Sequence, residues 1–317
     1  MNFKKANVNI ALLKYWGKID QSINLPAQTS ISVTASNFYT LTNITLDPTL
    51  TKDKVFLDGK ELTSLQYSRV ISHLDTLRAH FKRSEHCIVT SYNNVYIRAG
   101  FASSASSFAA LTAAYVEAIG AKVTKKELSK LARLGSGSAA RSIHGGFVIW
   151  HKGEDHDTSF AEKLPITWPE LRMIFTIIDS GIKPLSSRVG MQLCVEKAKS
   201  FAQFAAQSNA LVEPMISALT AKDIDEVGEL SEQSAELMRN VMLEAGIEYH
   251  TPATQKLINT ILSIREQHNI PVYYTFDAGP NLILLTTEAY VDKVLALLPN
   301  VKTEIGMVGG AISDEVA

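Results

Sequence analysis

The sequence predicts an α+β fold, in two lobes or as one large mixed domain, and three observations support this. Its 317 residues exceed the roughly 250–300 at which a single hydrophobic core usually stops growing. Strand patterns dominate the first hundred residues, whereas helical patterns dominate from residue 186 to about 246. The change falls near residues 165–185, so we expect one lobe over 1–170 and a second over 171–317.

Residue types define the elements of the first hundred positions. Residues 38–46 are rich in Tyr, Thr and Ile, which favour strands. Residues 55–57 lead into an Asp-Gly pair, which is a hairpin signal. A helix is expected from about residue 62 to 81, and a strand over 87–92.

The middle of the chain begins with helices. Apolar residues at helical spacing run up to Gly120, which is well placed to end the helix: Phe108, Leu111, Tyr115 and Ile119. Thr124 and Glu127 form a capping box ahead of a second helix. Strands are expected at 146–151 and 173–179.

The remainder is mainly helical until about residue 246. Thr251 and Pro252 are a favourable N-cap and first-turn pair for a further helix. Strands over 272–276 and 282–287 then flank a tight turn at 278–280.

Composition excludes several classes of protein. A net charge of −1 argues against a basic surface for nucleic acid or an anionic membrane, so positive charge for an anionic ligand has to be local. Cys87 and Cys194 lack metal-site spacing, which favours buried free thiols in a reducing compartment. We find neither a signal-peptide pattern nor an apolar stretch of about 18 residues, and therefore expect a soluble cytoplasmic protein.

Two segments rich in glycine and serine have the composition of anion-binding turns. Residues 100–106 lie between a predicted strand and helix, where a helix N-terminus offers free N–H groups; alternatively, Ser103 or Ser104 only caps that helix. Residues 135–141 match G-x-G-x-x-[GA] but follow a helix rather than a strand, which argues against a dinucleotide fold. This turn, with Arg141 behind it, can hold a phosphate or carboxylate, or it can be a plain helix–helix turn.

Two further segments place a charged residue after an apolar strand. Lys18 follows residues 10–17 and is either a point charge for an anion or an ordinary solvated lysine. No P-loop motif is present there. Asp277 precedes the turn at 278–280 and is either a base at a cleft or a simple turn-former. Residues 186–188 can be read as a plain helix N-terminus.

In combination and order, five motifs resemble those of the diphosphomevalonate decarboxylases, a family of the GHMP superfamily, over almost the whole chain. They are Asn9-Ile10-Ala11 with Lys14-Tyr15-Trp16-Gly17-Lys18, the segment Ala99 to Ala105, Gly135 to Arg141, Ser186 to Met191, and Asp277-Ala278-Gly279-Pro280-Asn281. The second part of the first motif and the last motif are fairly specific to the family, and Arg188 is typical of its bacterial branch. The resemblance implies a two-lobed GHMP kinase fold, with a ribosomal protein S5 domain 2-like N-terminal lobe and an α/β C-terminal lobe.

The resemblance also implies an activity. ATP would phosphorylate the tertiary hydroxyl of diphosphomevalonate, with Mg²⁺ as counter-ion, and the new phosphate would leave as carbon dioxide departs, giving isopentenyl diphosphate in the mevalonate pathway. Phosphoryl transfer depends mainly on positioning and on neutralising negative charge. A local cluster of Lys18, Arg141 and Arg188 suits that requirement. The family also leads us to expect a homodimer.

The resemblance assigns four residues to catalysis. Asp277 is expected beside the hydroxyl being phosphorylated. Lys18 is expected to hold Asp277 ionised, since an opposite charge within about 4–6 Å lowers the pKa of a carboxyl group. Arg141 and Arg188 are expected to grip the substrate carboxylate and diphosphate. The other substrate-binding residues are Ala11, Tyr15, Trp16, Gly17, Ser136, Gly137, Ser138, Ala139, Ala140 and Ser187. The ATP-binding residues are Ala99, Gly100, Phe101, Ala102, Ser103, Ser104 and Ala105.

Two segments depart from the family pattern. Tyr-Ile-Arg at 96–98 stands where the family usually has Pro-Thr-Ala, which places Arg98 beside the nucleotide phosphates. Arg239 replaces the histidine of a frequent Met-His-Ala. These changes leave a phosphomevalonate decarboxylase or a mevalonate-type kinase as alternatives. A catalytically silent ligand-binding protein of the same fold is a third, although the retention of Asp277 argues against it.

Overall fold

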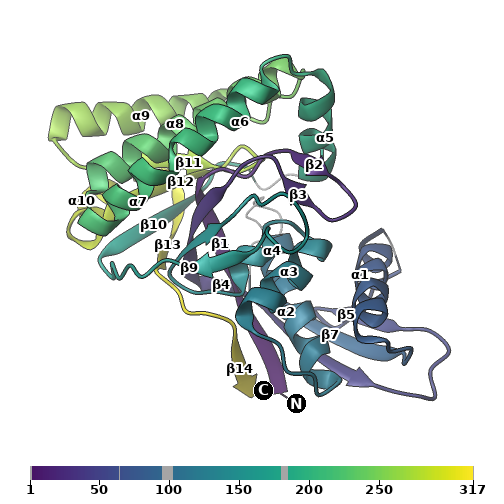
Figure 1. Cartoon of the computed structure of the whole chain (residues 1–317). Helices are drawn as coiled ribbons and strands as arrows, with labels where there is room; N and C mark the ends of the chain where they lie inside the picture. The colour runs from purple at the N-terminus through teal and green to yellow at the C-terminus, as the bar shows by residue number, and fades with distance from the viewer. Residues whose placement is uncertain (1, 64, 95–102, 180–184, 317) are drawn as a thin grey trace.

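Two long N-terminal strands form the centre of the first sheet. The computed structural model describes residues 2–63, 65–94, 103–179 and 185–316, and in it β1 (Asn2–Leu13) pairs antiparallel with β4 (Ser30–Leu46). Within those ranges the sheet runs β14-β1-β4-β7-β5-β6, while β8 pairs with the first part of β4 and β9 with β8 (Figure 1). Its other strands are β5 (Lys54–Leu57), β6 (Lys60–Glu61), β7 (Cys87–Asn94), β8 (Phe147–Trp150), β9 (Ala161–Lys163) and β14 (Ser313–Val316).

Helices cover one face of this sheet. They are α1 (Leu65–Phe81), α2 (Ser103–Ala118), α3 (Lys125–Gly135) and the short α4 (Ala139–Ser142). Leu74, Leu111 and Leu131, from three of these helices, share a buried core with Val89 of β7. At the start of α3, the Thr124 side chain accepts the N–H of Glu127, so the predicted N-cap is confirmed.

The second sheet is antiparallel and carries the C-terminal helices. Its order is β11-β12-β10-β13, with β10 (Leu171–Ile177), β11 (Tyr273–Phe276), β12 (Leu282–Thr287) and β13 (Lys302–Met307). The helices are α5 (Ser187–Lys197), α6 (Phe201–Ala210), α7 (Val212–Ala221), α8 (Ile224–Glu244), α9 (Pro252–His268) and α10 (Val291–Ala296). α8 lies so close to β11 that a Cβ atom at Gly228 would stand 2.0 Å from the Tyr273 ring, which is why glycine is needed there.

The two sheets share a hydrophobic core. Val8, Ile10 and Leu12 alternate along β1 and turn to the side away from α2, as the two-residue period of a strand requires. They are buried together with Phe175 of β10 and Ile283 of β12. The two sheets therefore cannot separate without exposing a common core.

The predicted elements are largely confirmed. The expected hairpin at 55–61, the helices near 62–81 and 108–119, and the strands at both ends of the turn at 278–280 are all present. β9, β13 and β14 were not predicted, because their polar segments carry weak strand patterns. β10 begins at Leu171 while β14 returns to the first sheet, and the division into lobes 1–170 and 171–317 stays a prediction.

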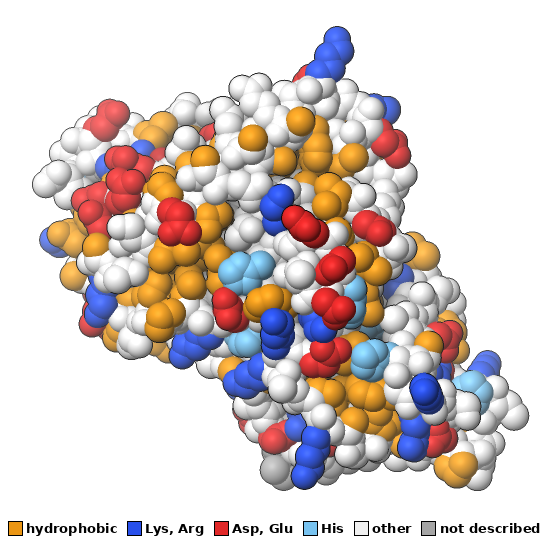
Figure 2. Space-filling view, in the orientation of Figure 1, with side chains coloured by type: hydrophobic (Ala, Val, Ile, Leu, Met, Phe, Trp, Pro, Cys, Tyr) orange, Lys and Arg blue, Asp and Glu red, His pale blue; other side chains and the backbone are white. Residues whose placement is uncertain are grey.

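The cysteines, the surface charge and the helices bear on the expectations from composition. Cys87 and Cys194 are both buried and free, as expected. On the face shown in Figure 2, basic and acidic side chains are interspersed rather than gathered into one basic patch. Among the described helices, none is long and apolar enough to cross a membrane.

Candidate active site

Segments that lie far apart in the sequence surround a cavity of about 470 Å³ between the two sheets. The end of β1 and the loop after it form its floor, and α1, the turn before α4, α5, α8 and the turn after β11 form its walls. The lining residues are Asn9, Ala11, Lys14, Tyr15, Trp16, Lys18, Leu65, Arg69, Ser104, Ser136, Gly137, Ser138, Arg141, Ser186, Ser187, Arg188, Val189, Met191, Met238, Asp277 and Ala278.

Most of the predicted substrate-binding residues meet at this cavity. Those among its lining residues are Ala11, Tyr15, Trp16, Lys18, Ser136, Gly137, Ser138, Arg141, Ser187, Arg188 and Asp277. Ala139 and Ala140 are fully buried in the packing behind the wall, and Gly17 lies against the Phe201 ring. The predicted ATP-binding residues 99–102 lie outside the described residues, as does Arg98. Ser103 begins α2, Ser104 lines the cavity and Ala105 is buried.

The lysine beside Asp277 is Lys14, and the prediction that Lys18 would hold this carboxylate is wrong. The Lys14 Nζ lies 3.2 Å from Asp277 Oδ1 and donates to the Ala11 carbonyl at 2.9 Å. Lys18 donates instead to Asn24 Oδ1 at 2.5 Å. Both lysines belong to one five-residue motif, and only the bend of the chain after β1 decides which of them faces the turn after β11.

Neighbouring elements fix the Lys14–Asp277 pair. Ser234 of α8 accepts the backbone N–H of Lys14 at 2.9 Å, and the turn after Asp277 is closed by a Gly279 N–H bond to its carbonyl at 2.8 Å. The Lys14 side chain is 1% exposed and that of Asp277 is 26% exposed. Burial lowers the pKa of the Lys14 ammonium, and the Asp277 carboxylate opposes that shift. The carboxylate is thus open to the cavity on one side and held by a buried cation on the other.

Arg141 is almost completely buried on α4, and its side chain is held by residues of β1 and β4. Its Nε donates to Asn9 Oδ1 at 3.0 Å and its Nη1 to Ser30 Oγ at 2.5 Å. Burial lowers the pKa of its guanidinium to about 10, which still leaves it protonated at neutral pH. No partner in the described ranges engages Nη2, so this nitrogen can donate to a bound anion.

Three further cations stand on one side of the cavity with no carboxylate bound to them in the described structure. Burial, followed by the charges of Arg188 and Arg69, lowers the pKa of Lys18 to about 8. Arg69 extends from α1, and its Nε is buried without a partner among the described atoms. An anion bound among these groups would relieve their mutual repulsion. Sequence reasoning missed Arg69, since nothing in the pattern of α1 marks it.

The turn from Ser136 to Ser138 supplies backbone donors to the same region. The N–H groups of Gly137 and Ser138 have no partner within the described structure, whereas those of Ala139 and Ala140 close the first turn of α4. A Cβ atom at Gly137 would lie 2.6 Å from the Tyr15 hydroxyl, so glycine is required for Tyr15 to reach this position. That hydroxyl is itself buried and unpartnered.

A second, smaller pocket of about 150 Å³ adjoins the cavity and shares Arg69 and Ser104 with it. Its walls are mainly apolar, with a few amide and hydroxyl groups. The lining residues are Val55, Phe56, Leu57, Leu62, Gln66, Arg69, Val70, Val89, Ser91, Asn93, Ser104, Ser107, Phe108 and Leu111. Such a shape suits a flat, weakly polar group joined to an anionic one.

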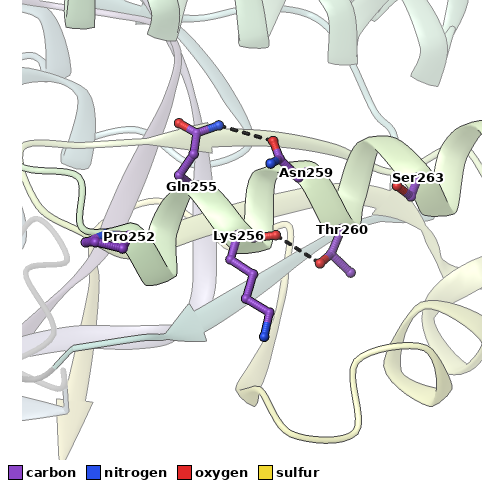
Figure 3. Close-up of a pocket in the computed structure, with 6 residues that line it drawn as sticks. All are labelled: Pro252, Gln255, Lys256, Asn259, Thr260 and Ser263. Carbon is purple, nitrogen blue, oxygen red and sulfur yellow. Dashed lines mark hydrogen bonds between the residues drawn. The ribbon is translucent and has the colours of Figure 1, made fainter.

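Two other regions bear on the prediction. Arg239 is paired with Glu248 at 2.8 Å and Glu236 at 3.8 Å, and its neighbour Met238 lines the cavity instead. A broad hollow runs along the exposed side of α9, where Figure 3 shows polar side chains and a single cation, Lys256. It lacks the convergent charges of the main cavity. In the described part of the chain, no group of three His, Cys, Asp or Glu residues could hold a metal ion.

Comparison with known proteins identifies the family. Residues 6–161 match the "Diphosphomevalonate decarboxylase-like N-terminal domain" and residues 173–307 the "Mevalonate 5-diphosphate decarboxylase C-terminal domain". The chain is 38% identical to the diphosphomevalonate decarboxylase of Candida albicans, over 92% of this chain and 86% of that one. It is 32% identical to the enzyme of Bos taurus, over 92% and 78% of the two chains.

Solved structures agree with the sequence relatives. A structure described as "MDDEF in complex with MVAPP, AMPPCP and Magnesium" matches with a TM-score of 0.95 and 34% identity, over 100% of this chain and 99% of that one. Mevalonate diphosphate decarboxylase from Staphylococcus aureus matches with a TM-score of 0.95 and 31% identity over the same shares. The two-lobed GHMP kinase fold implied by the resemblance is confirmed. This chain belongs to the diphosphomevalonate decarboxylase family.

Proposed function

We propose that the protein catalyses the ATP-dependent decarboxylation of diphosphomevalonate to isopentenyl diphosphate, with release of ADP, phosphate and carbon dioxide. The observation that carries this proposal is the Asp277 carboxylate, held 3.2 Å from buried Lys14 in a cavity lined by several unpaired cations. A base facing a set of anion-binding groups is what phosphorylation of a hydroxyl on a polyanionic substrate requires.

In the first step, Asp277 acts as the general base. Its carboxylate accepts the proton of the tertiary hydroxyl as the hydroxyl oxygen attacks the γ-phosphorus, and the bond to the ADP oxygen breaks. Lys14 limits the movement of the Asp277 carboxylate, because the Nζ that bonds to this carboxylate also donates to the Ala11 carbonyl. A positioned base of this kind contributes about 10²–10⁴-fold to the rate.

In the second step, the substrate loses carbon dioxide. The carbon–oxygen bond to the new phosphate breaks with its electron pair going to phosphate, and the electrons of the bond to the carboxylate form the double bond. Arg141, Arg188 and the backbone N–H groups of the 136–138 turn hold the substrate carboxylate and diphosphate in this proposal. Asn9 and Ser30 orient Arg141 for that contact.

The nucleotide would occupy the adjoining pocket. Its apolar walls suit the adenine base, and Ser104 with the N-terminus of α2 would face the phosphates where the two pockets meet. Mg²⁺ usually takes one or two carboxylates, water and substrate phosphates as ligands. The described residues contain no cluster of carboxylates or histidines for a metal, which fits an ion held mainly by the ATP phosphates and water. When bound, the ion would neutralise charge on the transferred phosphoryl group.

A coupled assay with purified protein, ATP, Mg²⁺ and diphosphomevalonate tests the proposal. We expect equal release of ADP, phosphate and carbon dioxide. Phosphomevalonate and mevalonate serve as control substrates. Turnover of the monophosphate but not of the diphosphate would refute the proposed substrate, and ADP release without carbon dioxide would indicate a kinase.

We also propose a cytoplasmic homodimer that does not bind nucleic acid. The two buried free thiols support a reducing compartment, and the net charge of −1 supports the absence of nucleic acid as a partner. The homodimer is carried over from the family. Light scattering after size-exclusion chromatography measures the mass directly, and a monomer at micromolar concentration would contradict it.

A further inference from the structure

A buried asparagine connects two anion-binding parts of the cavity. Asn24 lies in the turn between β2 (Lys18–Asp20) and β3 (Leu25–Pro26), at 4% exposure and with a backbone φ of 50°. Asparagine is one of the few residues other than glycine that adopt this left-handed conformation readily. The turn therefore accommodates Asn24 while directing its side chain inward.

All the polar atoms of the Asn24 amide are engaged. Its Nδ2 donates to the Arg133 carbonyl at 2.9 Å and to the Leu134 carbonyl at 2.8 Å, and its Oδ1 accepts from Lys18 Nζ at 2.5 Å. The two carbonyls belong to the last turn of α3, directly before the 136–138 turn. One side chain thus ties the Lys18 ammonium to the segment that supplies the backbone donors.

The chemistry of the amide matters as much as its position. Because both N–H bonds point at carbonyl groups, only the oxygen can face Lys18, and the amide cannot be reversed without placing its NH₂ group against an ammonium. A neutral acceptor also leaves the charge of Lys18 uncompensated. A carboxylate at this position would neutralise the charge of Lys18 and so weaken the binding of an anion.

We propose that Asn24 is a positioning residue that holds the Lys18 ammonium beside the 136–138 turn, so that the two together bind the diphosphate group of the substrate. The inference rests on the proposed function for the identity of that diphosphate. The general chemistry is recognition of a diphosphate by one ammonium and two backbone N–H groups. The opposing possibility is that Asn24 only ties the turn after β2 to α3 and that Lys18 finds its place without it.

A double-mutant cycle separates these two possibilities. Asn24→Gly keeps the left-handed backbone but removes the amide, and Lys18→Met removes the ammonium. We expect each change to weaken binding of inorganic pyrophosphate, measured by calorimetry at pH 7 without ATP, by about tenfold or more. The double variant should bind within about twofold of Lys18→Met, because both changes remove the same contact.

Two results would overturn the proposal. In the first, the losses of pyrophosphate affinity caused by the two single changes multiply in the double variant. In the second, Asn24→Gly binds pyrophosphate as tightly as the unchanged protein. Asn269→Gly is the matched control, since Asn269 has a φ of 51° at the end of α9 and lies outside both pockets, and it should bind normally. Pyrophosphate binding does not need turnover, so failure of the decarboxylation assay would leave this test intact.

Asn24→Asp keeps the proposal testable if the glycine variant does not fold. Its carboxylate still accepts from Lys18 but cannot donate to the two carbonyls. The unchanged protein should lose pyrophosphate affinity as the pH rises through about 8, where the pKa of Lys18 lies. In Asn24→Asp, affinity should be lower at pH 7 and the fall should move to higher pH, because the carboxylate raises that pKa. An unchanged midpoint would contradict contact between residue 24 and Lys18.

Discussion

Two lysines four positions apart occupy opposite environments in the same cavity. Lys14 is buried against Asp277, so its charge is matched by a carboxylate 3.2 Å away. Lys18 bonds to a neutral amide, and burial, followed by the charges of Arg188 and Arg69, lowers its pKa to about 8. Lys14 can position the Asp277 carboxylate, but its charge is already balanced and attracts a ligand only weakly. The charge of Lys18 is not balanced by a carboxylate, so Lys18 can bind an anion. We therefore expect Lys14 and Asp277, the paired side of the cavity, to act in the chemical steps. We expect Lys18 with its neighbouring arginines, the unpaired side, to act in substrate binding.

The largest loss of activity is expected when Asp277, the partner of Lys14, is changed. Asp277→Asn keeps the shape of the side chain but removes the base, and kcat should fall by about 10³-fold. Diphosphomevalonate affinity should change little, as measured by calorimetry. If the variant kept a tenth of the normal rate, Asp277 would not be the essential base.

Lys14→Met should produce the next largest loss. It removes the cation that faces Asp277, and we expect kcat to fall by about 10²-fold with a smaller change in KM. Removing one partner of a buried ion pair usually destabilises a protein, but the Asp277 carboxylate left behind is 26% exposed and can be solvated from the cavity. The melting temperature should therefore change little, and a fall that accompanies the rate loss would instead indicate general damage to the fold.

Lys18→Met tests the unpaired side. The KM for diphosphomevalonate should rise about tenfold with a smaller change in kcat, because a charge-assisted contact to the bound anion is lost. In the unchanged protein, kcat/KM should fall as pH rises through about 8, since Lys18 is charged below its pKa and neutral above it. The variant should lack this step. Equal losses in kcat and kcat/KM would place Lys18 with Lys14 in the chemical step.

Gly137→Ala tests whether the 136–138 turn contributes to substrate binding. The added Cβ would stand 2.6 Å from the Tyr15 hydroxyl, so Tyr15 or the turn has to move. We expect a rise of several-fold in the KM for diphosphomevalonate, because displaced backbone donors weaken anion binding. Gly246→Ala is a useful control for helix-end glycines, as no atom lies within 4 Å of its added Cβ, although its φ of 79° carries a backbone cost.

The smallest effect is expected at Arg239. This residue is paired with Glu248 and is absent from the cavity lining, so Arg239→His should leave the KM values for ATP and diphosphomevalonate within about twofold. Parallel kinetic assays on the two proteins would measure this. A marked change in preference between diphosphomevalonate and phosphomevalonate would show that Arg239 reaches the substrate through Met238.

The sequence predicted most of the residues that line the cavity but not the contacts among them. Four of the lining residues could be recognised only because several motifs together, in their order, resemble one family, since the local pattern at each left a plain structural reading open: Ser136, Arg141, Arg188 and Asp277. Arg69 could not, since one basic residue on an amphipathic helix resembles any solvated one. Asn24 could not either, because its significance depends on carbonyl groups more than a hundred residues away.

By itself, the sequence determined the α+β class, most helices and strands, the buried free thiols and most of the charged residues that line the cavity. The class, the elements and the thiols follow from local patterns of residues and from composition, whereas the charged residues were assigned by the resemblance of several motifs, in order, to one family. Tertiary structure decided which lysine faces Asp277, that β14 returns to β1, and that Arg141 is held by Asn9 and Ser30. Such contacts depend on how the chain bends after β1 and on which distant segments pack there. The five residues of Lys-Tyr-Trp-Gly-Lys contain both lysines but no information about the direction in which each one points.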